Sequence, residues 1–204
     1  MTEHSTDEDR IQRHALIDRL LHWLFAASIL FLLGTGFLPI IGIQFEWVTL
    51  HWGAGLLLLV FLAVHMWRAW IKTQFRKIWF GLTDARLALS GNEKPGKYSP
   101  AQKMMHFGVT VMVLATLVTG LIMMVKVDTP FWERNPYLLD SEVWGVIYVV
   151  HGFAALFLIT TVMLHIYFAV RPEKLMYLRA MFGGNMSKDE LEKNHDTAKW
   201  SGDE

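Results

Sequence analysis

Four histidines lie in two apolar runs of the chain, and their spacing is repeated. His51 and His65 lie in the run 50–70, whereas His151 and His165 lie in the run 143–170. The members of each pair are 14 residues apart, which on a helix of about 1.5 Å rise per residue places both imidazoles on one face, about 21 Å apart. Ionisable groups inside such a run indicate a functional site, and a hydrogen-bonded core histidine is the alternative. Two such helices that face each other can supply two axial imidazoles at each of two levels, which is what bis-histidine haem requires.

Matching residues in the two halves of the chain indicate a duplicated two-helix unit. Two matches are offset by 100 residues, His51 with His151 and His65 with His165. Two others are offset by 84 residues, His22 with His106 and Gly36 with Gly120. A larger second outer loop accounts for the longer offset. The six histidines then form an outer layer (His51, His151) and an inner layer (His22, His65, His106, His165).

The elements that must position these histidines are membrane-spanning helices. The chain has 204 residues, of which 53% are hydrophobic, and its mean hydropathy is +0.29, which is too apolar for an ordinary soluble domain. Four runs are long enough to cross a bilayer: about 20–40, 50–70, 104–125 and 143–170. We therefore predict an all-α fold, an integral membrane four-helix bundle. Its domains are a polar arm (1–17), a transmembrane di-haem domain (18–170) and a tail (171–204).

The distribution of charge predicts the orientation of the bundle. Lys and Arg number three in residues 1–19, seven in 71–103 and six in 171–204, against none in 41–49 and two in 126–142. The positive-inside rule therefore places both termini and the long middle connection in the cytoplasm. No cleavable signal peptide is visible, and no basic stripe with interleaved aromatic residues indicates a nucleic acid partner.

Cysteine is absent from the chain. This excludes an iron–sulfur cluster, a haem attached through Cys-x-x-Cys-His, and a disulfide. Any electron-carrying cofactor must therefore be held by histidine, and an iron–sulfur donor must belong to another subunit.

Four further residues are candidates for contacts with a haem. Arg19 and Arg68 lie near the cytoplasmic ends of the first and second runs, where they could neutralise propionate groups. Gly53 and Gly152 lie close to the outer histidines, where small residues leave room for a flat macrocycle. Small residues are also common at helix contacts.

Four motifs support a family assignment: Ile17-Asp18-Arg19-x-x-His22-Trp23, His51 before the small residues of the second run, Gly96-Lys97-Tyr98-x-x-x-Gln102-Lys103-Met104-Met105, and His151 with Leu164-His165-x-Tyr167. With these motifs, residues 17–170 resemble the gamma, cytochrome b subunit of membrane-bound formate dehydrogenases. That subunit falls within the bacterial family that includes the cytochrome b subunits of nickel-iron hydrogenases.

The resemblance implies two haems b, with His51 and His151 as ligands of a periplasmic haem and His22 and His165 as ligands of a cytoplasmic one. It also implies that a periplasmic iron–sulfur (beta) subunit, served by a catalytic (alpha) subunit, supplies electrons. They would reduce menaquinone or ubiquinone near the cytoplasmic face of the bacterial inner membrane.

The quinone site implied by the resemblance involves the loop before the third helix, and its candidate residues are Tyr98, Ser99, Gln102 and His106. Where the family can have Asn, this chain has Ser99, followed by Pro100. Independently of the resemblance, Ser99 is suited to cap the third helix, with Pro100 in its first position.

The spacing and the family motif differ on one ligand. Spacing pairs His65 with His165, whereas the motif pairs His22 with His165. We favour His22 because its Arg-x-x-His-Trp context matches the family. His65 and His106 are then candidates for tuning a haem, for relaying protons to a quinone, or for holding a third haem.

Other functions remain as alternatives. Within the same class, the chain could serve a nickel-iron hydrogenase or a thiosulfate reductase, or act as a free-standing cytochrome b. A histidine-lined metal or proton transporter is disfavoured because the spans carry no acidic residue beside the histidines. A cofactor-free anchor would leave the repeated spacing unexplained.

Overall fold

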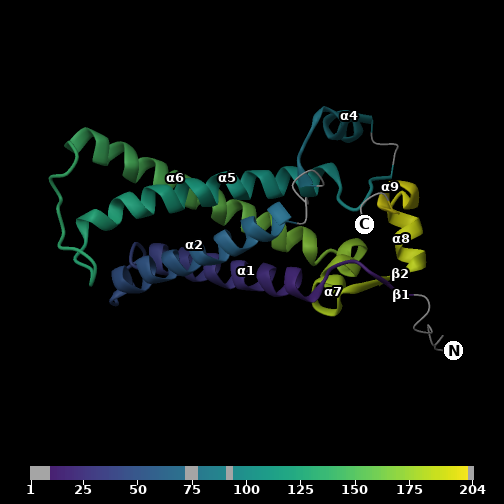
Figure 1. Cartoon of the computed structure of the whole chain (residues 1–204), viewed down its shortest axis with the longest axis horizontal. Helices are drawn as coiled ribbons and strands as arrows, with labels where there is room; N and C mark the ends of the chain where they lie inside the picture. The colour runs from purple at the N-terminus through teal and green to yellow at the C-terminus, as the bar shows by residue number, and fades with distance from the viewer. Residues whose placement is uncertain (1–9, 72–77, 91–93, 202–204) are drawn as a thin grey trace. The chain divides into compact units, whose positions relative to one another are not determined.

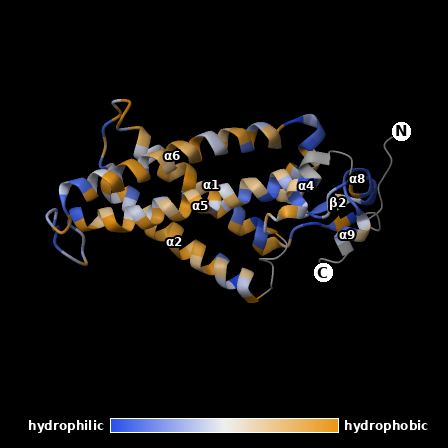
Figure 2. Ribbon diagram, turned by 90° about the horizontal axis from the view of Figure 1, so that it is seen from above, coloured by the Kyte–Doolittle hydropathy of each residue, from blue (hydrophilic) through white to orange (hydrophobic). Residues whose placement is uncertain are grey.

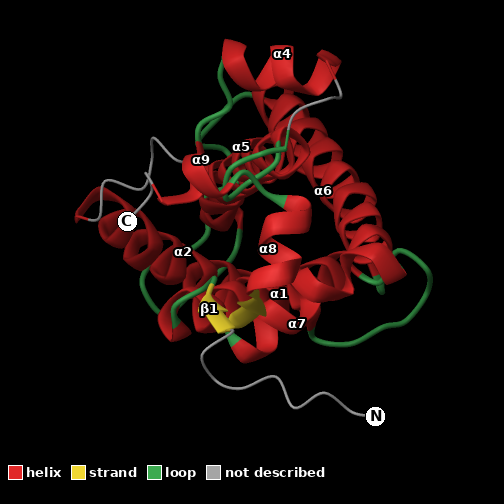
Figure 3. Ribbon diagram, turned by 90° about the vertical axis from the view of Figure 1, so that its right-hand side faces the viewer, coloured by secondary structure: helices red, strands yellow, loops and turns green. Residues whose placement is uncertain are grey.

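The computed structural model describes residues 10–71, 78–90 and 94–201 (Figure 1). Most of these residues are helical, and Figure 3 shows the helices in red and a single strand pair in yellow. The first nine residues of the predicted polar arm lie outside the described ranges.

Four of the helices in the described ranges are long and apolar enough to cross a membrane. They are α1 (Leu16–Phe37), α2 (Trp47–Ile71), α5 (Pro100–Met123) with its 3-10 extension η2 (Met124–Lys126), and α6 (Ser141–Ala169). Figure 2 shows that hydrophobic residues dominate along these helices, whereas the connections are more hydrophilic. Many large apolar side chains on them face outward, and Trp70, Val149 and Phe153 are 78%, 70% and 65% exposed. Such a surface is suited to lipid rather than to water, so the chain is a multi-pass membrane protein.

The helix ends differ from the predicted span ends by a few residues, and local sequence explains the differences. Helix α1 ends at Phe37, before Pro39, because a proline disfavours helical geometry in the residue that precedes it. Helix α5 begins at Pro100, as predicted. The Ser99 hydroxyl accepts from Gln102 N (3.3 Å) and Gln102 Oε1 accepts from Ser99 N (2.8 Å). This reciprocal capping box satisfies two backbone donors at the start of the helix.

The described residues form two compact units, and one of them consists of residues 23–68 and 108–163. Its buried core contains Leu58 of α2, Val113 and Leu117 of α5, and Leu158 of α6. Partly buried residues of α1, including Phe25, Ile29 and Leu32, pack against this core. All four long helices therefore contribute to one apolar core in this unit.

The other unit contains residues 10–22, 78–90, 94–107 and 164–201 among those described. Strand β1 (Arg10–Gln12) pairs antiparallel with β2 (Asn185–Ser187), so that Ile11 lies opposite Met186. No pattern in the sequence predicts this pairing. The shorter helices of this unit are α4 (Leu82–Ser90), η3 (Pro172–Lys174), α7 (Leu175–Gly183), α8 (Lys188–Asn194) and α9 (Thr197–Ser201).

A buried arginine organises this second unit. Arg13 is 2% exposed, and its guanidinium lies 4.7 Å from the ring centre of Tyr177 and 5.1 Å from that of Trp200. It donates to Lys97 O (2.9 Å) and to His195 Nε2 (3.2 Å). His195 Nδ1 in turn donates to the carbonyl oxygen of Gly96 (2.7 Å), and burial lowers the pKa of His195. These contacts join three segments that are far apart in sequence.

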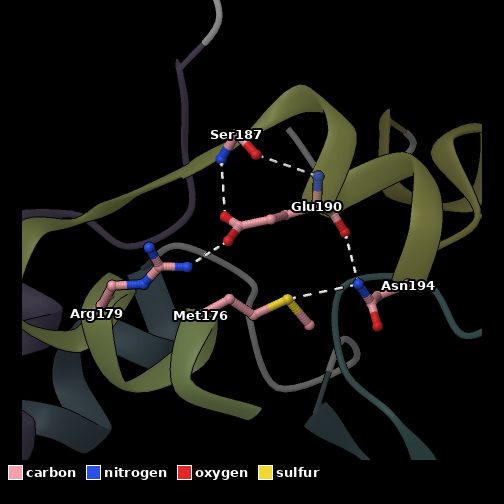
Figure 4. A network of polar contacts seen from close by, with 5 residues as sticks. All are labelled: Met176, Arg179, Ser187, Glu190 and Asn194. Carbon is pink, nitrogen blue, oxygen red and sulfur yellow. Dashed lines mark hydrogen bonds and ion pairs between the residues drawn. The ribbon is translucent and has the colours of Figure 1, made fainter. Parts of the chain in front are cut away.

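Polar contacts also fix the start of α8, as Figure 4 shows. The Ser187 hydroxyl accepts from Glu190 N (3.2 Å), and the Glu190 carboxylate accepts from Ser187 N (3.1 Å). The same carboxylate is paired with Arg179 of α7. This capping box thus ties α8 to both β2 and α7.

Candidate functional site

Two imidazoles face each other in the first unit. His51 is close to the start of α2, and His151 lies in α6. Their ring centres are 6.2 Å apart and their planes are inclined by 64°. Both residues are partly buried. The structure therefore brings together the two residues that the sequence predicts as outer ligands.

A second imidazole pair lies in the other unit. His22 of α1 and His165 of α6 have ring centres 6.1 Å apart and planes inclined by 53°. His65, the alternative that spacing suggested, forms a T-shaped contact with Phe25, with ring centres 5.7 Å apart. The histidine found beside His165 is thus the one indicated by the motif.

The separation within each pair fits coordination of one metal ion from opposite sides. An imidazole nitrogen binds a transition metal ion at about 2.0 to 2.1 Å, and it lies about 1.1 Å from its ring centre when the ring bonds are about 1.33 Å. Two opposed rings would then have centres about 6.2 to 6.4 Å apart, close to both observed values. Within the described residues, no group of three or more His, Asp or Glu side chains is arranged to hold a metal ion. His51 with His151, and His22 with His165, are each arranged as a pair of imidazoles, which is the number of protein ligands that a bis-histidine haem requires.

Two threonines that are not among the predicted site residues contact the first pair. Thr35 Oγ1 lies 2.8 Å from His51 Nδ1, and Thr119 Oγ1 lies 2.8 Å from His151 Nδ1. Thr35 and Thr119 are 84 residues apart, so the offset that relates Gly36 to Gly120 could have identified them.

Glycines adjoin the same imidazoles. A Cβ atom added at Gly36 would lie 3.6 Å from His51 Cε1, and one added at Gly120 would lie 3.5 Å from His151 Cε1. Added Cβ atoms at Gly53 and Gly152 would meet no atom within 4 Å. There is accordingly open space beside the two glycines that the sequence predicts as cofactor contacts.

Two buried N–H groups near the histidines have no hydrogen-bond partner in the described part of the chain. They are Nε1 of Trp52, the residue after His51, and Nε of Arg19, three residues before His22. Orphaned buried donors of this kind indicate a missing ligand or water. The Arg19 guanidinium also donates to the carbonyl oxygen of Phe182, and Arg68 is partly buried near the end of α2.

The predicted quinone residues lie around the start of α5. Ser99 and Gln102 are engaged with each other in the capping box, so that Gln102 Oε1 is already an acceptor. Tyr98 precedes this box, and His106 is partly buried in the second turn of the helix. The loop before Tyr98 is held by the contacts of Gly96 and Lys97 with His195 and Arg13.

Comparison with known proteins shows the family of this chain. The model of the prokaryotic cytochrome b561 family matches residues 13–184. The cytochrome b556 subunit of a formate dehydrogenase from Haemophilus influenzae is 26% identical over 187 residues, which cover 80% of this chain and 72% of that protein. The chain therefore belongs to the prokaryotic cytochrome b561 family. Membership implies haem b binding and an electron-transfer role, and the resemblance found in the sequence motifs is confirmed.

Proposed function

We propose that the chain is the di-haem b electron-transfer subunit of a membrane-bound formate dehydrogenase. In this proposal, His51 and His151 hold one haem, and His22 and His165 hold the other. The observation that carries the proposal is the presence of two imidazole pairs with ring centres 6.2 and 6.1 Å apart, each close to the separation of opposed ligands on one metal ion.

Haem b held between two imidazoles supplies reversible one-electron oxidation and reduction. The chain's own residues orient the ligands and surround them with apolar helices. Thr35 and Thr119 contact the Nδ1 atoms of one pair, while Gly36 and Gly120 allow close approach of the helix backbone to the rings. Arg19 and Arg68 would neutralise propionates, and Gly53 and Gly152 would leave room for the macrocycle.

The absence of cysteine supports partnership with other subunits. A chain without cysteine holds no iron–sulfur cluster of the ordinary kind, so its electron donor is an iron–sulfur (beta) subunit that receives electrons from a catalytic (alpha) subunit. The excess of Lys and Arg in the termini and in the middle connection supports a cytoplasmic location for these segments in the bacterial inner membrane. As the family resemblance implies, the donor docks on the periplasmic side.

Menaquinone or ubiquinone is the proposed acceptor, near the cytoplasmic face. Its site would involve Tyr98, Ser99, Gln102 and His106, of which Ser99 and Gln102 also form the cap of α5. His65 remains a candidate for tuning a haem or relaying protons.

Haem stoichiometry and electron donors test this function. The purified chain is expected to contain two haems b by the pyridine haemochrome spectrum, and one after His51→Ala or His22→Ala. Formate should reduce the haems in membranes, and alpha and beta subunits of a formate dehydrogenase should co-purify. A colourless wild-type chain would overturn the proposal.

A nickel-iron hydrogenase or thiosulfate reductase complex is the alternative within the family. Haem reduction in membranes distinguishes a hydrogenase from a formate dehydrogenase. Reduction of the haems by hydrogen but not by formate would assign the chain to a hydrogenase. The similarity to the Haemophilus influenzae subunit favours formate dehydrogenase.

A further inference from the structure

Two threonine hydroxyls have the same surroundings in the two halves of the first unit. Thr35 is 4% exposed and Thr119 is 8% exposed. Each has its Oγ1 atom 2.8 Å from the Nδ1 atom of one imidazole of the His51–His151 pair. Each is followed by the glycine that approaches the same imidazole. The two contacts thus repeat in both halves of the duplication.

Hydrogen counting determines which atom donates in these contacts. A threonine hydroxyl carries one hydrogen, and in a helix it commonly donates to a carbonyl oxygen in the preceding turn. Thr119 Oγ1 is 2.6 Å from Ala115 O, and Thr35 Oγ1 is 3.0 Å from Phe31 O. Because the hydroxyl donates its one hydrogen to the carbonyl oxygen, it has none left to donate to the histidine. The short contact to each histidine therefore requires that Nδ1–H donates to Oγ1. Nε2 is then the unprotonated nitrogen, available as a metal ligand.

We propose that Thr35 and Thr119 are positioning residues that hold His51 and His151 in the Nδ1-protonated tautomer and thereby set the redox potential of the haem between them. This inference rests on the proposed ligand assignment and adds a role that the assignment does not contain. A partner that accepts a hydrogen bond from the distal nitrogen fixes the ring orientation and raises the basicity of a ligating imidazole. A more basic ligand stabilises the ferric state, so loss of the hydroxyl should raise the midpoint potential.

The chain offers a matched control for the two threonines. Thr161 of α6 is 7% exposed, and its Oγ1 donates to Phe157 O at 2.8 Å. It is therefore a buried threonine of the same unit with the same backbone bond. Thr161→Val removes a hydroxyl without removing a described contact to a histidine.

A redox titration of the full-length cytochrome, followed at the haem absorption bands, tests the inference. Thr35→Val and Thr119→Val should each raise one midpoint potential, with a change of about 3- to 10-fold in the ratio of oxidised to reduced haem at a given potential. At 59 mV per tenfold change for one electron, this is about 30 to 60 mV. The other midpoint should not move. Thr35→Ser and Thr119→Ser, which restore the hydroxyl, and Thr161→Val should retain wild-type values.

Three results would overturn the inference. They are unchanged midpoints in both valine variants, equal shifts in the serine and valine variants, and equal movement of both haems. Where a valine variant does not accumulate, the alanine variant removes the same hydroxyl and is expected to shift the potential in the same direction. Failure of the ligand assignment is recognised separately, because wild-type haem content would then survive His51→Ala.

Discussion

The ring of His22 lies 6.1 Å from the ring of His165, centre to centre. Spacing within the apolar runs favours His65 for this position, because His65 and His165 occupy equivalent places in two runs with the same 14-residue separation. In the structure the His65 ring forms a T-shaped contact with the Phe25 ring. The pair therefore joins two histidines that the sequence offsets do not relate to each other, since His22 matches His106 and His65 matches His165.

This difference predicts distinct results for two alanine variants. His22→Ala should reduce the haem content from two to one per chain, because one of two axial ligands is lost, whereas His65→Ala should retain both haems. The pyridine haemochrome spectrum of the purified protein measures the content. Two haems in His22→Ala together with one haem in His65→Ala would show that the assignment is wrong.

The second prediction concerns the close approach at Gly36. A Cβ atom at this position would lie 3.6 Å from His51 Cε1, an ordinary van der Waals distance, so Gly36→Ala should bind both haems. The larger side chain in Gly36→Leu should displace the imidazole and remove one haem, because a packed interior gives way poorly to added atoms. Gly145→Leu is the control, since an added Cβ there meets no atom within 4 Å. Full haem content in Gly36→Leu would contradict the prediction.

The third prediction concerns Gly184, which ends α7 with a positive φ of 88°. A Cβ atom there would lie 3.2 Å from both Arg19 Cζ and His14 O, and the left-handed conformation alone costs a residue other than glycine about 1 to 2 kcal/mol. Gly184→Ala should therefore speed hydrogen exchange of the amides in β1 and β2 by about 5- to 30-fold. Gly183→Ala should not, because its added Cβ meets no atom within 4 Å. Equal exchange in the two variants would argue against strain at Gly184.

The fourth prediction is a loss of stability of this unit at acidic pH. Burial lowers the pKa of His14 to about 4, and burial also lowers the pKa of His195. In an unfolded chain the pKa of both residues is about 6.5. Below about pH 6.5 the unfolded segment thus binds more protons than the folded one. The contribution of these two histidines to the free energy of unfolding is therefore fully present above this pH and is lost as the pH falls toward 4. Protection of the β1 and β2 amides, corrected for the intrinsic pH dependence of exchange, should decrease from pH 7.5 to pH 5.

His14→Gln provides the control for this titration. The variant removes one of the two titrating groups, so the decrease in protection should be smaller than in the wild-type protein. Protection that is independent of pH in the wild-type chain would contradict the prediction.

The sequence by itself determined the four long apolar helices, the start of α5 and the family. These features depend on local chemistry: the length of an apolar run, the cap formed by Ser99 and Gln102, and motifs of a few residues. It also placed His51 and His151 on matching helices, because a 14-residue spacing is read along one helix without knowledge of any other.

The motif around His22 already favoured this residue as the partner of His165. Only the tertiary structure decided how close the two rings lie, which hydroxyls contact the imidazoles, and that β1 pairs with β2. Each of these depends on how one helix is rotated against another or on contacts between segments more than a hundred residues apart. Helical periodicity defines a face of a helix, but it does not define what packs against that face. Packing brings the ring of His22 to 6.1 Å from that of His165, and it brings Thr35 and Thr119 to the Nδ1 atoms of His51 and His151.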